Sequence, residues 1–262
     1  MKLKGRVAII TGAGRGLGRA AAMAMAREGA VVVIMSRTLP EIRETERLIK
    51  AGGGKVVALK GDVSKGKDIH KVVERALSIF DHIDILMNNA AIIGPVKPLC
   101  EIRENEWNKV FGINLRGALL FSRAVIPYMM QQRKGKIINV TSGLGEMTMP
   151  SFGAYSVTKA GLIHLTKILS EELKDCNIRV NGLDPGVMDT RMQDEVRSMG
   201  PGVLGHELYN EFMEMKKRGL LTPPERIASL AVFLASGEAN HISGENGTEA
   251  DYMRFGYKAA RA

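Results

Sequence analysis

The sequence predicts a single α/β domain, with a doubly wound (Rossmann-type), mostly parallel sheet covered by helices on both faces. Short apolar, β-branched segments recur along the 262 residues and alternate with segments of helical periodicity. The strand-like segments are apolar on both faces, as strands buried in a parallel sheet are. No Pro/Ser-rich linker and no fixed-period repeat divides the chain, so one domain is expected over residues 1–262.

The alternation sets the order of the elements. The predicted strands are Val7–Ile10, Val31–Met35, Val56–Leu59, Ile83–Met87, Ile137–Val140 and Ile178–Leu183. The predicted helices are Gly16–Glu28, Leu39–Ala51, Lys67–Phe80, Glu104–Gln131, Tyr155–Asp175 and Pro224–Ala235. Strands that alternate with helices in this way form right-handed βαβ units.

Residues 191–222 interrupt this rhythm. The segment carries Gly200-Pro201-Gly202, several Met and mixed charge, and it follows the sixth predicted strand. An insertion after the carboxyl end of a strand lies over the crevice where such sheets bind ligands. We therefore expect a lid over the substrate, although a surface helical hairpin would have the same composition.

Charge and composition exclude several classes of protein. The net charge of +9 raises the possibility of a nucleic-acid-binding protein, but the Lys and Arg residues are dispersed, and no zinc-finger spacing is present. We expect no nucleic-acid partner, since an anionic cofactor explains the charge as well. Two cysteines, Cys100 and Cys176, are too few for a disulfide framework or a metal cluster.

Compartment is inferred from the same composition. Val7–Ile10 is too short for the apolar core of a signal peptide, and no apolar run approaches the length of a membrane helix. Few cysteines suit a reducing compartment. A cytoplasmic protein with no membrane partner is expected.

A glycine-rich turn follows the first predicted strand and opens the first helix. Gly12, Gly16 and Gly18 have the spacing Gly-x-x-x-Gly-x-Gly, with Arg15 and Leu17 inside it. Glycine lets the backbone approach a phosphate, and the helix N-terminus offers free N–H groups to it. A dinucleotide site is expected, although a purely structural tight turn would look similar.

The end of the second strand selects between cofactors. An acid there would bind the adenosine ribose and favour NAD, whereas a basic residue would accept the 2′-phosphate of NADP. Here Ser36 and Arg37 occupy the position, and no acid follows until Glu41. Arg37 and Arg15 could clamp the phosphate, so NADP is favoured over NAD. The alternative is two exposed loop arginines.

Three residues suggest acid–base chemistry. Tyr155 and Lys159 lie four residues apart and so share one helix face, and Ser142 stands at the end of the preceding strand. A nearby ammonium favours the phenolate, so Lys159 is expected to lower the pKa of Tyr155. Ser142 could donate a hydrogen bond to a carbonyl oxygen. A Tyr–Lys pair at this spacing also occurs by chance.

Taken together, the motifs carry a resemblance. In chain order they are Gly12–Gly18, Asn88–Ala91, Asn114, Ser142, Tyr155–Lys159, Pro185-Gly186 and Thr190. From Lys4 to about Gly244 the chain resembles the short-chain dehydrogenase/reductase family in its single-domain variety.

The resemblance implies catalytic roles. Tyr155 would be the general acid–base, and Lys159 would lower its pKa and bind the nicotinamide ribose. Ser142 would orient the substrate carbonyl, and Asn114 would hold a water that links Lys159 to solvent.

The resemblance also implies cofactor contacts. They are Asp62 and Val63 at the adenine, Asn89 and Ala90 beside the adenosine ribose, and Pro185, Gly186, Met188 and Thr190 at the nicotinamide. A homotetramer or homodimer is likewise implied.

Three positions depart from the family pattern. Ala91 replaces a frequent glycine, and Asp184 precedes Pro185 where a small polar residue is usual. We expect Asp184 to cap a turn rather than to contact substrate. Residues 245–252 are poor in β-forming side chains, which puts the usual last strand and its subunit contacts in doubt.

The expected function is an NADP(H)-dependent oxidoreductase that interconverts a ketone and a secondary alcohol. Within that class, the substrate could be a 3-oxoacyl thioester or a polyol, sugar-like or alicyclic ketone. Met residues near the crevice suggest an apolar, adaptable pocket, and no basic cluster for a phosphopantetheine arm is present in the insertion. The alternative from another class is a non-catalytic nucleotide sensor.

Overall fold

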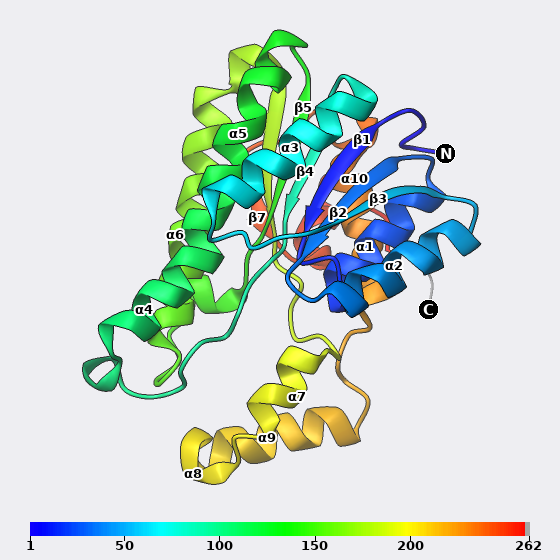
Figure 1. The fold of residues 1–262 in the computed structure, drawn as a ribbon. Helices are drawn as coiled ribbons and strands as arrows, with labels where there is room; N and C mark the ends of the chain where they lie inside the picture. The colour runs from blue at the N-terminus through cyan, green and yellow to red at the C-terminus, as the bar shows by residue number, and fades with distance from the viewer. Residues whose placement is uncertain (260–262) are drawn as a thin grey trace.

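Seven parallel strands form one sheet in the order β3-β2-β1-β4-β5-β6-β7 (Figure 1). The computed structural model describes residues 1–259. The strands are β1 Val7–Thr11, β2 Val31–Ser36, β3 Lys55–Lys60, β4 Ile85–Asn88, β5 Gly135–Val140, β6 Ile178–Leu183 and β7 Asn246–Gly247. The strand order reverses between β1 and β4, which confirms the doubly wound prediction.

Helices cover both faces of the sheet. One face carries α1 (Gly16–Arg27), α2 (Leu39–Ala51) and α10 (Pro224–Ala235). The other carries α3 (Gly66–Phe80), α5 (Gly117–Gln131) and α6 (Gly153–Glu172). Short helical turns lie in the connections: η1 Leu99–Glu101, η3 Gly143–Gly145, η4 Lys174–Cys176 and η5 Gly237–Ala239.

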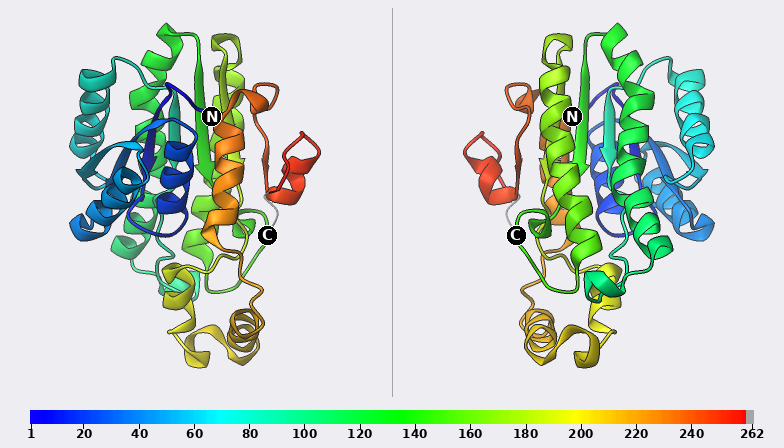
Figure 2. Two further views of the ribbon diagram at one scale, coloured as in Figure 1. Left: turned by 90° about the vertical axis from the view of Figure 1, so that its right-hand side faces the viewer. Right: turned by 90° about the vertical axis from the view of Figure 1, so that its left-hand side faces the viewer.

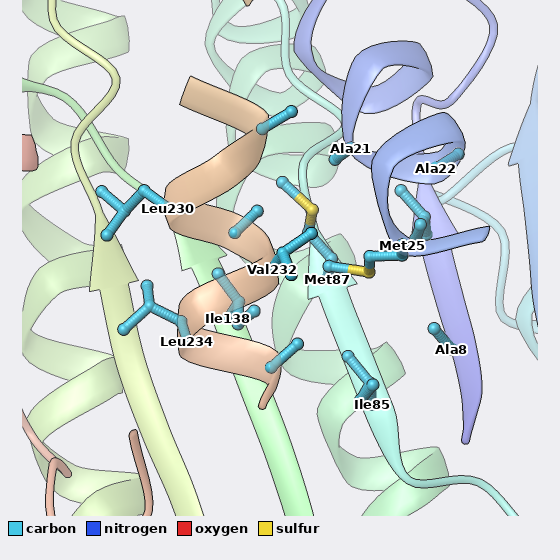
Figure 3. Packing of buried hydrophobic residues seen from close by; sticks show 14 of the residues in the cluster. Ala8, Ala21, Ala22, Met25, Ile85, Met87, Ile138, Leu230, Val232 and Leu234 are labelled. Carbon is cyan, nitrogen blue, oxygen red and sulfur yellow. The ribbon is translucent and has the colours of Figure 1, made fainter. Parts of the chain in front are cut away.

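The core between α1, α10 and the sheet depends on small side chains. Alanines on the inner side of α1 allow this helix to approach both α10 and the sheet, and longer side chains of α10 fill the remaining space (Figure 3). The buried residues labelled there are Ala8, Ala21, Ala22, Met25, Ile85, Met87, Ile138, Leu230, Val232 and Leu234. This packing makes the sheet a rigid base for the loops at its carboxyl edge.

One predicted helix is interrupted. The stretch Glu104–Gln131 consists of α4 (Glu104–Phe111), a π-helical turn η2 (Gly112–Arg116) and α5. Within residues 1–259 it is the one helical stretch that is long and apolar enough to cross a membrane, but 44% of its apolar window is buried. The core-facing side of α5 explains that composition.

The insertion forms three helices: α7 (Arg191–Arg197), α8 (Pro201–Leu204) and α9 (His206–Lys217). They stand together beyond one end of the sheet (Figure 2). Val196 and Phe212 of the insertion pack with Val96 and Phe152 of the main body in a separate apolar cluster. The insertion is therefore attached to the main body by apolar contacts.

The C-terminal segment replaces a long last strand. β7 has two residues, and α11 (Glu249–Met253) follows it. Tyr252 is 1% exposed, and its hydroxyl donates to the carbonyl of Gly182 on β6 at 2.6 Å. The buried Tyr252 side chain thus adds to the backbone hydrogen bonds between β6 and β7 in holding the segment to the sheet, where β-forming residues are lacking.

We predict that Tyr252→Phe lowers the free energy of unfolding by about 1–3 kcal/mol, because the carbonyl of Gly182 loses its hydroxyl donor inside the core. Chemical denaturation measures this difference. Met253→Ala, at a side chain that is 57% exposed, is the matched control and should change stability by less than about 0.5 kcal/mol. Equal effects of the two changes would contradict the anchoring role of the phenol.

Candidate active site

A cleft of about 890 Å³ opens at the carboxyl ends of the strands, where the strand order reverses. Its walls come from the turn after β1, the ends of β2 and β4, the start of α6 and the base of the insertion. A cleft of this size and position is typical of a ligand site in a doubly wound sheet.

The turn after β1 is built for close backbone approach. Gly12 has φ +65°, and a Cβ there would lie 2.8 Å from the Cα of Ala90. Gly16 has φ +52° at the start of α1. Gly18 lies beneath the turn, because a Cβ there would meet the carbonyl oxygen of Gly12 at 2.5 Å. Gly18 therefore permits packing rather than lining the cleft.

Side chains lock this turn to the loop after β4. The Thr11 hydroxyl oxygen accepts from the backbone N–H groups of Asn89 and Ala90, each at 3.0 Å. The Asn89 amide donates to the carbonyls of Thr11 at 2.8 Å and Gly12 at 3.2 Å. Asn89 thus shapes the turn as well as lining the cleft.

Two residues outside the glycine motif support the turn and were not predicted from the sequence. The Thr45 hydroxyl of α2 donates to the carbonyl of Ala13 at 2.9 Å. Arg19 donates to the carbonyl of Gly14 and to the Thr45 oxygen. In the sequence, only the position of Arg19, directly after Gly18 in the first turn of α1, could have indicated that it supports the glycine turn.

The end of β2 presents a basic residue to the cleft. Ser36 and Arg37 line it. The positive charge of Arg37 acts on the nearby carboxylate of Asp62 and favours its ionised form. Burial opposes ionisation of Asp62, but hydrogen bonds from Ser64 and the charges of Arg37 and Lys65 outweigh it and lower the pKa. Asp62 itself does not line the cleft, whereas Val63 does.

Arg15 takes part in a four-membered ring of charges that sequence analysis missed. It lies 3.8 Å from Glu41 and 3.3 Å from Glu195 of the insertion. Arg191 pairs with the same two acids, at 3.5 Å from Glu41 and 3.3 Å from Glu195. This charge ring joins the glycine turn, α2 and α7. Glu41, the first acid after the end of β2, therefore also lines the cleft.

Tyr155 and Lys159 lie on α6 at the inner end of the cleft, and both are buried. The Lys159 Nζ lies 5.4 Å from the centre of the Tyr155 ring. It donates a hydrogen bond to the carbonyl of Val140 at 2.6 Å. Ser142, the residue expected to polarise a carbonyl, is close enough to Tyr155 for its side chain to hydrogen-bond the phenol.

The predicted lowering of the Tyr155 pKa is wrong for the protein on its own. Burial raises this pKa to about 12, the Ser142 hydrogen bond acts in the opposite direction, and the charge of Asp184 raises it further. Burial also lowers the pKa of Lys159 to about 8. The sequence spacing revealed the proximity of the two groups but not the desolvation that dominates both.

Asn114 stands in the π-helical turn η2. Its side chain exchanges two 2.9 Å hydrogen bonds with the backbone of Ile92 and donates to Thr158 at 3.2 Å. A small cavity of about 10 Å³, room for roughly one water, is lined by Asn114 and Lys159. The side chain therefore anchors the loop after β4, and a role in holding a water stays a prediction.

The segment after β6 forms the remaining wall. Pro185, Met188 and Thr190 line the cleft. Gly186 has φ +64°, and its N–H donates to Asp184 Oδ1 at 2.9 Å. The expectation that Asp184 caps a turn is confirmed.

Most of the predicted cofactor residues meet at this cleft. Those that line it are Gly12, Arg15, Gly16, Leu17, Ser36, Arg37, Val63, Asn89, Ala90, Tyr155, Lys159, Pro185, Met188 and Thr190. Gly18, Asp62 and Gly186 are not among the residues that line it.

Comparison with known proteins assigns the family. A sequence model described as short chain dehydrogenase matches residues 6–200. The chain belongs to the short chain dehydrogenase family. It is an oxidoreductase with a nucleotide-binding fold of the Rossmann type, as the motifs predicted.

Relatives within the family resemble the whole chain. It is 33% identical over 245 residues to the 3-oxoacyl-(acyl-carrier-protein) reductase FabG of Thermotoga maritima, covering 94% of this chain and 96% of that protein. It is 35% identical over 246 residues to the (S)-acetoin-forming diacetyl reductase of Staphylococcus epidermidis, covering 92% and 95%. The crystal structure of levodione reductase matches with a TM-score of 0.87 at 27% identity, covering 97% of this chain and 100% of that one.

We predict that Lys159 makes stability depend on pH. Its folded-state pKa of about 8 lies below the ordinary value of about 10.4, so the unfolded chain binds more protons between these values. The free energy of unfolding should therefore rise from pH 7.5 to 9.5, by about 1–2 kcal/mol from this group. Denaturation of Lys159→Met should show a smaller rise.

Lys136 provides the matched comparison, since burial lowers its pKa to about 8 as well. Lys136→Met should remove a similar part of the rise. A pH dependence that stays the same in both variants would show that neither ammonium is desolvated as described.

Proposed function

We propose that the protein is an NADP(H)-dependent oxidoreductase that interconverts a ketone and a secondary alcohol. The observation that carries this proposal is the buried pair Tyr155 and Lys159 in a cleft that the glycine turn also lines, with the half-buried Ser142 next to the Tyr155 phenol. A proton donor beside a dinucleotide site suits hydride transfer to a carbonyl.

The residues present fit a dinucleotide. A side chain at Gly12 or Gly18 would collide with backbone atoms, so only glycine allows the turn to pack this closely at the start of α1, where the N–H groups of a helix N-terminus suit a phosphate. Arg37 and Arg15 line the cleft beyond the end of β2 and suit a 2′-phosphate. The Pro185–Thr190 segment, which lines the opposite side, would hold the nicotinamide.

Within this arrangement the chain controls a proton and a carbonyl. The hydride for the carbonyl carbon comes from a reduced nicotinamide when one is bound. Tyr155, with a pKa of about 12, keeps its proton at neutral pH and donates it to the carbonyl oxygen, which yields the alcohol. Ser142 orients that oxygen, and the Lys159 ammonium stabilises the phenolate that remains. In the reverse direction the phenolate takes the hydroxyl proton.

Residues 191–222 are proposed as a lid. The charge ring ties Glu195 of α7 to Arg15 at the mouth of the cleft, and Val196 and Phe212 pack on the main body. Apolar contacts combined with exposed ion pairs suit a segment that closes over substrate and opens again.

Assembly and compartment follow as further parts of the proposal. Leu119 on α5 and Val157 and Ile168 on α6 are large, exposed apolar side chains. We propose that these helices contribute to a homodimer or homotetramer in the cytoplasm.

A 3-oxoacyl-thioester reductase is the second candidate, favoured by the likeness to the reductase of Thermotoga maritima. A screen of NADPH oxidation against cyclohexanone, butan-2-one, hydroxyacetone and acetoacetyl-CoA separates the two. Turnover confined to acetoacetyl-CoA would favour the thioester reductase. Nucleotide binding without turnover of any carbonyl would favour a sensor and contradict both.

Tyr155→Phe should reduce turnover in this screen by at least about 10²-fold, because the proton donor is lost while the ring remains. NADPH binding, measured by fluorescence titration, should change by less than about threefold. Tyr128→Phe, at a residue that is 40% exposed, is the control and should match the wild type. Retained activity in Tyr155→Phe would refute the acid–base role.

Arg37→Asp should shift the ratio of kcat/KM for NADPH over NADH toward NADH by about 10–100-fold, since charge-assisted hydrogen bonds to the 2′-phosphate are lost. Steady-state kinetics with both nucleotides measure this ratio. Arg75→Asp, at an exposed position of α3 outside the cleft, controls for net charge. An equal ratio in wild type and Arg37→Asp would show that Arg37 does not select the cofactor.

A further inference from the structure

The carboxylate of Asp184 is only partly used by the fold. Asp184 follows β6 and is 9% exposed. Its Oδ1 accepts the N–H of Gly186 at 2.9 Å. Within residues 1–259, no hydrogen bond is made to Oδ2. The turn therefore needs one carboxylate oxygen and leaves the other available.

The second oxygen lies next to the segment that follows Ser142. Asp184 Oδ2 lies 3.4 Å from the point that a Cβ would occupy on Gly143, the residue after Ser142. Gly143 has no side chain, and the Cε of Met147, a side chain that is 64% exposed, lies 3.3 Å from the same point. The charge of Asp184 also acts on Tyr155 and Lys159 of α6. The carboxylate is thus beside the place where Ser142 and Tyr155 would hold a carbonyl oxygen.

The charges around Asp184 favour a hydrogen-bond donor over an anion. Glu146, after η3, and Asp251, on α11, add negative potential, and Lys159 supplies the opposing positive charge. Glu146 already accepts from Asn246 at 2.9 Å. Burial raises the pKa of Asp184 from its ordinary value, and Lys159 acts against that rise. An anionic substrate group would meet a largely negative surrounding, whereas a hydroxyl would find an acceptor.

We propose that Asp184 determines substrate specificity by accepting a hydrogen bond from a hydroxyl on the carbon next to the reacting carbonyl. The preferred substrates are then α-hydroxy ketones, with vicinal diols in the reverse direction, and 2-oxo acids are disfavoured. This inference rests on the proposed ketone reductase activity. A charged acceptor in a water-poor site discriminates strongly against a ligand that lacks the donor.

Three small ketones of similar size test the proposal: butan-2-one, hydroxyacetone and pyruvate. For the wild type, kcat/KM is measured with each, and the same series is run with Asp184→Asn, which keeps an acceptor for Gly186. We expect the hydroxyacetone to butan-2-one ratio to fall about tenfold in the variant and the pyruvate value to rise about tenfold. Asp175→Asn, an exposed acid on η4, should leave the ratios at their wild-type values.

Binding measured by ligand-observed NMR separates this proposal from the proposed function, because it needs no turnover. Hydroxyacetone should bind about tenfold more weakly to Asp184→Asn than to wild type, and butan-2-one equally well. If the wild type binds hydroxyacetone preferentially but reduces no ketone, the proposed function fails and the assignment of Asp184 stands.

Unchanged preference in Asp184→Asn overturns the assignment, whether preference is read from kinetics or from binding. Asp184→Ser repeats the test should the asparagine variant lose its folded circular dichroism spectrum, because serine also supports a turn of this kind. A Ser variant with wild-type preference would overturn the proposal equally.

Discussion

The site depends on the close approach of two backbone segments, the glycine turn after β1 and the loop after β4. The approach at Gly12 leaves no space for a Cβ beside Ala90. The Asn89 side-chain amide donates hydrogen bonds to the carbonyls of Thr11 and Gly12 in the turn. Because β1 and β4 are neighbours at the point where the strand order reverses, both segments emerge at one edge of the sheet. The cleft mouth exists because these two segments are held at contact distance.

Burial then decides the chemistry of the inner end. Tyr155 and Lys159 are both removed from water, so each is pushed toward its neutral form: the phenol keeps its proton, and the ammonium gives its own up more readily. The negative charge of Asp184 raises the pKa of both groups, so it favours the protonated lysine and also the protonated phenol. The protein alone is therefore poised as a proton donor. Formation of the phenolate depends on what occupies the cleft.

Local patterns predicted most of the fold and most of the lining of the cleft. The strand Ile178–Leu183 and the helices Leu39–Ala51 and Pro224–Ala235 have the predicted bounds, because apolar runs and turn residues mark their ends. The glycine turn and the Tyr155–Lys159 spacing were readable because each lies within one short segment. Such signals can be read without knowing how segments far apart in the sequence pack together.

What the sequence did not reveal depends on contacts between distant segments. Arg15 and Glu195 are 180 positions apart, so their ion pair leaves no local pattern. Asn114, in the π-helical turn, hydrogen-bonds the backbone of Ile92 on a segment 22 positions away. The Tyr155 pKa follows from burial, which spacing alone does not report. The doubt about the last strand was readable from residues 245–252, but its replacement by an anchor was not, because Tyr252 reaches β6 from a separate helix.

The charge ring has a consequence for redesign of this enzyme. Arg15 faces the region where a nucleotide phosphate would lie, and it also holds Glu195 of α7. Exchanging Arg15 or Glu41 to suit another nucleotide therefore also loosens or tightens the attachment of the insertion. A substitution at either residue therefore changes the ion pairs that hold α7, whereas Arg37 stands outside the ring and can be replaced without breaking them.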